Sequence, residues 1–220
     1  MDRASVVLAA VAALLVLLRL IGSLHGTDVP AVVAALPVGL FMADFISALA
    51  HWLGDTYFDA DTPVLGAIVG AFRLHHRDPD AFRRHDFFER NRNNCLVALP
   101  LLVLAWWLLA EEHRHGQPLV GTALAVAAVL LASATQIHAW AHDEDVPRLV
   151  GWFQHAGLLL SRERHTRHHR GTHNRAYGIV NGWANAVLDR SRFFRHAETL
   201  AARIGVRPES LASERRSHAR

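Results

Sequence analysis

The hydrophobic residues of the chain fall into long blocks, and polar stretches rich in arginine and histidine separate them. About 20 apolar residues in a helix cross the ~30 Å hydrocarbon core of a bilayer. Blocks of about this kind, the third one shorter, occupy residues 5–24, 30–53, 95–110 and 118–140. We therefore predict an all-α protein with four membrane-spanning helices.

The first block has a second interpretation. Residues 6–18 also have the length of the apolar core of a cleaved signal peptide. We favour a span because three further blocks follow. Arg19, the one charge in this block, lies near its end, from where its side chain can reach the interface.

The arginines predict how the spans are oriented. All 23 basic residues are arginines, and the chain contains no lysine. With four spans, one side of the membrane carries Arg3, six arginines of residues 54–94 and fourteen after residue 140, and the other side carries Arg114 alone. The positive-inside rule then places both termini in the cytosol. We expect a multi-pass integral protein, with the bacterial inner membrane as its location.

Histidines are the candidate chemical groups. His165, His168 and His169 have the i, i+3, i+4 spacing of one helical face, and His138 and His142 have the i, i+4 spacing. His75 and His76 are adjacent, and His51 ends the second block. The predicted topology brings all of them to the cytosolic face. Neutral imidazole is a common transition-metal ligand, so a metal site would explain such crowding.

The number of histidines favours two metal ions over one. Zinc needs three or four ligands, whereas eight imidazoles suit two irons with open positions for dioxygen. We expect two iron ions per chain and these ligands: His51, His75, His76, His138, His142, His165, His168 and His169. One such cluster alone would be better explained as a solvated histidine pair. Four clusters on one face favour a site.

Four residues have more than one interpretation. His75 and His76 point about 100° apart on a helix, so they serve different metals, or one ligates and the other supports it. Asp55 either adds a carboxylate ligand or orients His51. Asp44, inside the second block, either has a functional role or is a buried acid paired with an arginine.

Composition limits the alternatives. The chain of 220 residues has room for one compact unit, which we place at residues 1–196, with an amphipathic interfacial segment at 146–160. Residues 197–220 are predicted to form a surface helix and an arginine-rich tail. Cys95 is the single cysteine, which excludes disulfides and cysteine-based zinc sites. No glycine-rich nucleotide loop is present, and the small net charge of +3 gives no reason to expect a nucleic-acid partner.

An ordered set of motifs resembles the Kua/CarF lipid desaturases, a family that includes the plasmanylethanolamine desaturases, with plant fatty acid desaturase 4 as a more distant relative. The resemblance covers roughly residues 40–190. The motifs are residues 51–56 (HWLGDT), 72–76 (FRLHH), 84–89 (RHDFFE), 93–95 (NNC), 138–142 (HAWAH), 165–169 (HTRHH) and 177–185 (YGIVNGWAN).

The resemblance implies a four-span enzyme with a histidine-bound di-iron centre at the cytosolic face. The implied reaction removes two hydrogens from C1 and C2 of the sn-1 alkyl ether of a phospholipid and makes the vinyl ether of a plasmalogen. It consumes O2. Because we find no redox domain, we expect electrons from a cytochrome b5-like or ferredoxin-like donor that docks on the arginine-rich face.

Three positions bear on the subtype. The plant relatives have glutamine at the position of His85, so His85 with Asp86 favours the ether-lipid branch. His85 is therefore a candidate ligand or ligand support. The ether-lipid members often have a histidine at the position of Arg164, which we take as neutral or supporting. His173 matches the family but lies past Gly171, and it is a candidate ligand only.

The same centre could instead desaturate an acyl chain or hydroxylate its substrate. A different class of protein is a non-catalytic membrane protein that stores or transports metal. Transport needs a polar path through the membrane, and Arg19 and Asp44 are the only charges within the predicted spans. The sequence therefore favours an enzyme.

Overall fold

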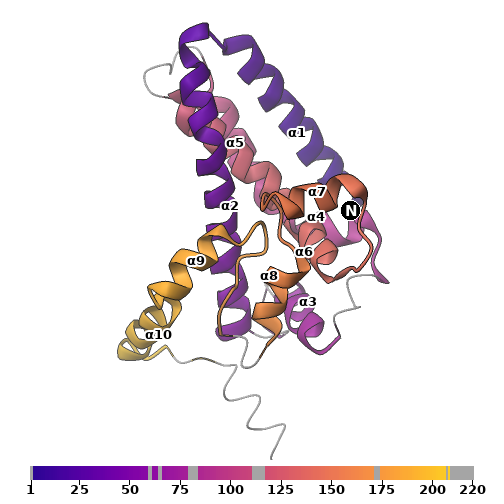
Figure 1. Cartoon of the computed structure of the whole chain (residues 1–220), viewed down its shortest axis with the longest axis vertical. Helices are drawn as coiled ribbons and strands as arrows, with labels where there is room; N and C mark the ends of the chain where they lie inside the picture. Colours follow the sequence, from indigo (N-terminus) through magenta and orange to yellow (C-terminus); the bar gives the residue numbers. More distant parts are fainter. Residues whose placement is uncertain are drawn as a thin grey trace, which may run out of the picture.

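The computed structural model describes residues 2–58, 61–63, 66–78, 84–110, 117–170, 174–206 and 208, and every regular element in these ranges is a helix (Figure 1). The elements are α1 (Asp2–Ser23), the 3-10 helix η1 (Gly26–Asp28), α2 (Val29–Thr56), α3 (Gly66–Arg77), α4 (Phe87–Leu108), α5 (Gln117–Ala132), α6 (Ala134–His142), α7 (Arg148–His155), α8 (Arg162–His169), α9 (Trp183–Arg190) and α10 (Phe193–Arg203). The all-α prediction is confirmed for the described residues.

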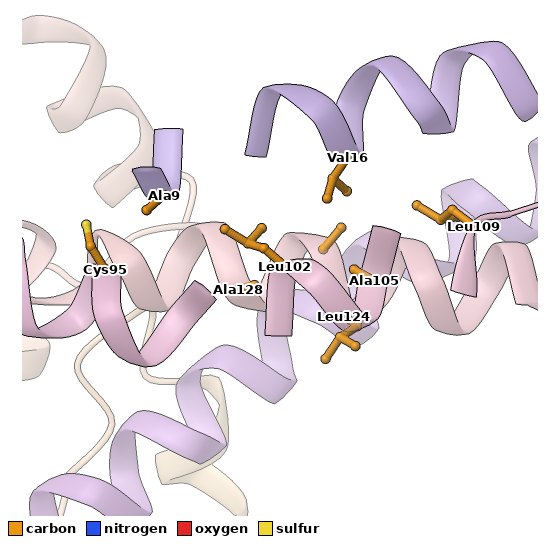
Figure 2. Packing of buried hydrophobic residues seen from close by; sticks show 9 residues of the cluster. Ala9, Val16, Cys95, Leu102, Ala105, Leu109, Leu124 and Ala128 are labelled. Atoms are coloured by element: carbon orange, nitrogen blue, oxygen red, sulfur yellow. The ribbon is translucent and has the colours of Figure 1, made fainter. Parts of the chain in front are cut away.

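The long helices α1, α2, α4 and α5 pack side by side, and the short helices α3, α6 and α8 gather at one end of them (Figure 1). Figure 2 shows how α1 lies along α4, with Ala9 and Val16 on the side of α1 that faces Leu102, and Leu124 of α5 belongs to the same buried cluster. All four are buried. The opposite side of α1 exposes large apolar residues, including Leu8 and Leu18, as expected of a helix that faces lipid.

Small residues bring α2 into close contact with α5. Ala35, Gly39, Ala43 and Ser47 recur every four residues along α2, and each is buried. A side-chain carbon added at Gly39 would lie 2.6 Å from the carbonyl oxygen of Ala123. Small residues let helix backbones approach in this way. Continued by one and two turns, the same stripe reaches His51 and Asp55, so the packing of α2 on α5 aims both at the end of the bundle.

Two helices are long and apolar enough to cross a membrane, in the segments Arg3–Ser23 and Gly26–Thr56. They correspond to the predicted spans 5–24 and 30–53. Within the described residues, α4 is not among the helices that are long and apolar enough to cross a membrane. It begins eight residues before the predicted third span at 95–110 and ends at Leu108, and residues 89–94 near its start are all polar.

The predicted fourth span, 118–140, is not one continuous helix. It is divided into Pro118–Ala132 and Ala134–His142, which meet at an angle of 52° and together pass as one bent candidate span. The break falls at Ser133, whose N–H donates to the carbonyl of Leu130, an i to i−3 bond that tightens and ends the helix. Two polar residues, Thr135 and Gln136, lie between the break and the first histidine of α6.

The start of α4 explains part of the RHDFFE motif. Asp86 accepts a hydrogen bond from the N–H of Glu89 at 2.8 Å, and Glu89 accepts from the N–H of Asp86 at 3.2 Å. This reciprocal pair is a capping box, which satisfies two backbone donors that would otherwise lack partners. Asp86 therefore has a structural role that its sequence position alone did not reveal.

The C-terminal helix begins at Phe193, four residues before the boundary predicted at 197, and it ends at Arg203. The predicted arginine-rich tail lies mostly outside the described residues. Phe194 packs against Trp52 and Tyr177, and Trp52 donates a hydrogen bond from Nε1 to Glu198 at 3.1 Å. These contacts fix α10 beside the last turns of α2.

Replacement of Gly39 by alanine should destabilise the protein, because the added methyl group has no space between α2 and α5. We expect a loss of about 1–3 kcal/mol, the usual cost of forcing a methyl group into a close-packed interface. Gly22→Ala is the matched control, since no atom lies within 4 Å of the carbon it adds. Thermal unfolding in detergent, followed by circular dichroism, measures both. Equal melting temperatures for the two variants would show that α2 and α5 do not pack this closely.

Candidate metal centre

Nine donor atoms gather at the end of the bundle in two neighbouring groups. The first, the five-histidine group, contains His75, His138, His142, His165 and His169. The second, the four-ligand group, contains His51, Asp55, His76 and His168. Within each group all donor atoms lie within 4.8 Å of one another, so each could hold a metal ion. The structure thus brings together all eight histidines that the sequence singled out, and Asp55, the candidate carboxylate, lies with three of them.

Helix geometry explains how four short segments supply two groups. His138 and His142 lie one turn apart on α6, and His165 and His169 lie one turn apart on α8, so each pair points to the five-histidine group. Adjacent residues on a helix point about 100° apart. His75 and His76 on α3 therefore belong to different groups. This arrangement agrees with the interpretation that the two histidines serve different metals.

The same division occurs on α8, where His168 joins the four-ligand group and His169 joins the five-histidine group. The two groups are close neighbours. The ring centroids of His76 and His169 are 5.1 Å apart, and those of His51 and His75 are 5.7 Å apart.

The nitrogen spacing of the five-histidine group suits a cation. Nε2 of His165 lies 2.8 Å from Nε2 of His138, 3.0 Å from that of His142 and 2.9 Å from that of His169. A neutral imidazole has one N–H, so hydrogen bonds cannot satisfy all three approaches at once. Two nitrogens bound about 2.1 Å from one ion stand about 3 Å apart when they subtend a right angle at it. The observed spacing therefore fits the donor set of a metal site.

The electrostatics keep these imidazoles in the form that binds metal. Burial, followed by the charges of neighbouring histidines, lowers the pKa of His75 and of His165 far below the ordinary histidine value. Burial and His51 lower the pKa of His168 to about 4, although Asp55 acts in the opposite direction. A ligating histidine must be neutral, so no proton has to be displaced at neutral pH.

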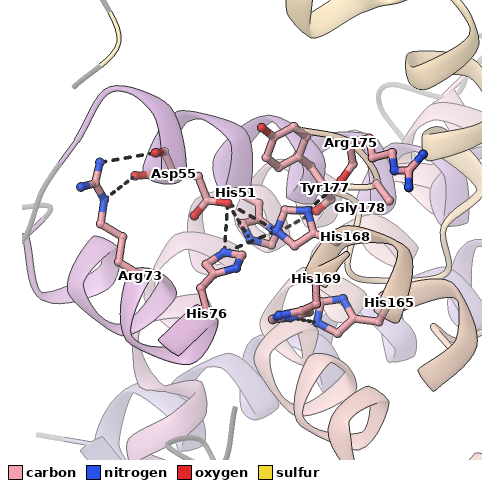
Figure 3. Close-up of polar contacts among 12 residues, drawn as sticks. His51, Asp55, Arg73, His76, His165, His168, His169, Arg175, Tyr177 and Gly178 are labelled. Carbon is pink, nitrogen blue, oxygen red and sulfur yellow. Dashed lines mark hydrogen bonds and ion pairs between the residues drawn. The ribbon is translucent and has the colours of Figure 1, made fainter. Parts of the chain in front are cut away.

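The four-ligand group is built around one carboxylate oxygen. Oδ2 of Asp55 lies 3.2 Å from Nε2 of His51, 3.1 Å from Nε2 of His76 and 3.5 Å from Nε2 of His168 (Figure 3). Arg73 donates to the carbonyl oxygens of Gly54 and Asp55, at 3.5 and 3.4 Å, and so holds the last turn of α2. This group combines three nitrogens with an oxygen, unlike its all-nitrogen neighbour.

Two backbone carbonyls orient ligands of the four-ligand group. Nδ1 of His51 donates to the carbonyl of Tyr177 at 3.0 Å, and Nδ1 of His168 donates to that of Arg175 at 2.7 Å (Figure 3). These bonds place the proton on Nδ1 and leave the lone pair of Nε2 for a metal. These partners could not be predicted from the sequence, because a backbone carbonyl has no residue-type signature.

The other candidate residues lie elsewhere. His85 is exposed at the start of α4, with Nδ1 3.3 Å from Oε2 of Glu89, and it joins neither group. Asp44 is fully buried and accepts hydrogen bonds from backbone N–H groups of residues 180–184. Among the described residues no arginine pairs with it. His173 lies outside the described residues. Arg164 donates to the carbonyl of Asn181 at 2.7 Å and is not part of either group.

Comparison with known proteins gives a consistent result. A family model described as a lipid desaturase domain matches residues 40–211, a range that contains both ligand groups. No solved structure matches the chain.

The chain is also similar to curated proteins. It is 38% identical over 168 residues to the plasmanylethanolamine desaturase of Myxococcus xanthus, a match that covers 76% of this chain and 59% of that protein. It is 36% identical to plasmanylethanolamine desaturase 1 of Mus musculus, over 78% of this chain and 65% of that one. It is 37% identical to the chloroplastic fatty acid desaturase 4 of Arabidopsis thaliana, over 78% and 52%. The chain thus spans between about half and two thirds of the length of these relatives.

Alanine at a ligand position should remove the metal of one group more than that of the other. We expect His138→Ala to empty the five-histidine group and His51→Ala to empty the four-ligand group. Each should cost more than the roughly 10–100-fold in metal affinity that follows loss of an outer hydrogen-bond partner. Metal analysis of purified protein by mass spectrometry measures the effect, and exposed His196 on α10 is the control position. A wild-type metal content in both variants would contradict the assignment of His138 and His51 as metal ligands.

Proposed function

The chain belongs to the lipid desaturase family, and we propose that it is a membrane di-iron enzyme that forms the vinyl-ether double bond of plasmalogens. Its substrate would be an sn-1 alkyl ether phospholipid of the plasmanylethanolamine type. The observation that carries the proposal is the pair of adjacent ligand groups with nine donor atoms. Iron held there would supply activation of dioxygen, which an unactivated alkyl chain requires.

The electron balance requires a partner. Reduction of O2 to two waters takes four electrons and four protons. Two hydrogen atoms come from adjacent carbons of the lipid chain, and the remaining two electrons and two protons come from outside. We propose a cytochrome b5-like or ferredoxin-like protein as the electron donor.

The exposed face of α8 supports the proposal that the electron-donor protein docks at this end of the molecule. His165, His168 and His169 point inward to the ligand groups, whereas Arg167 and Arg170 are exposed on the same short stretch. Arg167 pairs loosely with Glu163, at 3.6 Å. An electron carrier docked against α8 would be separated from the ligand groups by little more than the width of one helix, which is about 10 Å.

We propose that the chain crosses the membrane four times. α1 and α2 supply the first two spans, the apolar part of α4 the third, and α5 with α6 the bent fourth. The arginine distribution supports an orientation with both termini and the ligand groups on the cytosolic side. We propose a bacterial inner membrane as the location. The lipid headgroup stays at this interface while the ether chain reaches the centre from the bilayer. How far the chain threads determines which carbons meet the metals.

The choice of an ether over an acyl chain rests on His85. The relatives named for plasmanylethanolamine and the plant fatty acid desaturase are almost equally similar to this chain, at 36–38% identity. Overall similarity therefore does not separate the two substrates. An acyl-lipid desaturase or a hydroxylase of the same di-iron type is the alternative function.

Expression in a host without plasmalogens tests the substrate. With an alkylglycerol in the medium and a compatible electron donor, the ether lipids should become two mass units lighter and acid-labile, because a protonated vinyl ether is a stabilised oxocarbenium ion that water splits. Lipid mass spectrometry before and after acid treatment measures this, and His138→Ala is the inactive control. An acid-stable double bond in an acyl chain would support the plant-like alternative, and a gain of sixteen mass units would indicate hydroxylation.

His85→Gln tests the residue that separates the branches. Because His85 lies outside both ligand groups, the variant should keep its metal and lose ether-lipid turnover. We expect a loss of about tenfold, equivalent to one hydrogen bond worth about 1.4 kcal/mol. Exposed His155 on α7, replaced by glutamine, is the matched control. An unchanged product and rate in His85→Gln would remove the basis for the ether-lipid assignment.

A further inference from the structure

We propose that Asp44 is a positioning residue that determines metal affinity in the four-ligand group from outside it. It would act by fixing the backbone segment 175–184, whose carbonyls orient His51 and His168. The inference rests on the proposed two-metal function. It assigns a role to a buried acid of α2 that belongs to neither ligand group.

Within the described residues, the side-chain hydrogen bonds of Asp44 are with one stretch of backbone. Oδ1 accepts hydrogen bonds from the N–H groups of Val180, Asn181 and Gly182, at 3.0, 3.0 and 3.1 Å. Oδ2 accepts from the N–H of Ala184 at 2.9 Å. Consecutive N–H groups that converge in this way form a concave anion site. Bonds of this kind to a carboxylate are about twice as strong as neutral ones. Asp44 therefore fixes a stretch that has no helix or sheet of its own before α9.

A glycine shows how closely this backbone approaches Asp44. A side-chain carbon added at Gly178 would lie 2.7 Å from Oδ2 and 2.8 Å from Oδ1 of Asp44. Such a distance is not tolerated, so any larger residue would displace the carboxylate or the segment. One turn further along α2, Oγ of Ser47 accepts from the N–H of Ile179 at 3.1 Å. The segment is thus held against α2 along its length.

The same segment presents its carbonyls to the metal ligands. The carbonyl of Tyr177, one residue before Gly178, accepts from Nδ1–H of His51, and the carbonyl of Arg175 accepts from Nδ1–H of His168. Both imidazoles are fully buried. A shift of the segment would therefore release two of the three histidines of the four-ligand group from the tautomer and orientation that aim Nε2 at the metal.

The five-histidine group depends less on this segment. Its ligands come from α3, α6 and α8. Ile137 and Ala141 of α6 belong to a buried apolar cluster that includes residues of α2 and α5 and also Ile179 and Val180 of the segment. The segment thus reaches this group through apolar packing, whereas it accepts hydrogen bonds from two ligand rings of the other group. Loss of Asp44 should therefore weaken one metal position selectively. A general structural role would weaken both equally.

Cobalt titration of the metal-free full-length protein in detergent tests this selectivity. Co²⁺ bound by nitrogen and oxygen ligands gives visible absorption, so the number of ions and their affinities can be counted. Asp44→Asn keeps the shape of the side chain but turns one acceptor into a donor that faces a backbone N–H. Wild-type protein should bind two ions, and Asp44→Asn should bind the second about 10–100-fold more weakly, the usual effect of losing support for a ligand. Asp28→Asn, the same substitution at the opposite end of α2, is the matched control and should stay close to wild type.

The outcomes separate the two proposals. Wild-type protein that binds fewer than two ions contradicts the two-metal function itself. Two ions in the wild type with unchanged affinities in Asp44→Asn overturns the role of Asp44, and so does an equal loss of both ions. If Asp44→Asn does not show native helicity by circular dichroism, Gly178→Ala replaces it, because the added methyl group displaces the carboxylate without removing it. The same outcomes then decide.

Discussion

The rest of the structure depends on the crowding of nine donor atoms in two groups at one end of a helical bundle. Neutral imidazoles whose lone pairs converge do not attract one another, so the ligands cannot hold themselves together. Other forces must bring α2, α3, α6 and α8 into position. The close packing of α2 on α5 at Gly39 and the anchoring of a backbone segment by Asp44 are two of these forces. Both come from the same helix that carries His51 and Asp55.

The two ligand groups differ in chemistry although they share helices. Five nitrogens make one group neutral, whereas Asp55 brings a negative charge and an oxygen to the other. A carboxylate ligand stabilises the higher charge states of a metal better than an imidazole does. Two equal ions bound here would therefore not be equivalent, and the four-ligand position would be the easier one to oxidise.

The sequence predicted the parts of the site that follow from helix periodicity. The spacing of His138 with His142, and of His165 with His169, is a local property, and the structure places each pair in one group. The bend at Ser133 was missed, because an apolar run with three scattered hydroxyl residues has the same composition whether it is straight or broken. The partners of Asp44 were also missed. Four backbone N–H groups from more than 130 residues away leave no trace in residue type, whereas an arginine would have.

The bend between α5 and α6 links the chemistry to the thickness of the bilayer. Of these two helices, α5 follows the direction of the bundle, and its 16 residues give it a length of about 24 Å. α6, which carries two ligands, turns away from α5 by 52°. In the proposed four-span arrangement, α5 is shorter than the ~30 Å hydrocarbon core. The ligand groups then lie at a depth set by a rigid helix, and lipid must thin or the protein must tilt to match it. Which methylene of a lipid chain reaches the metals becomes a property of protein and membrane together.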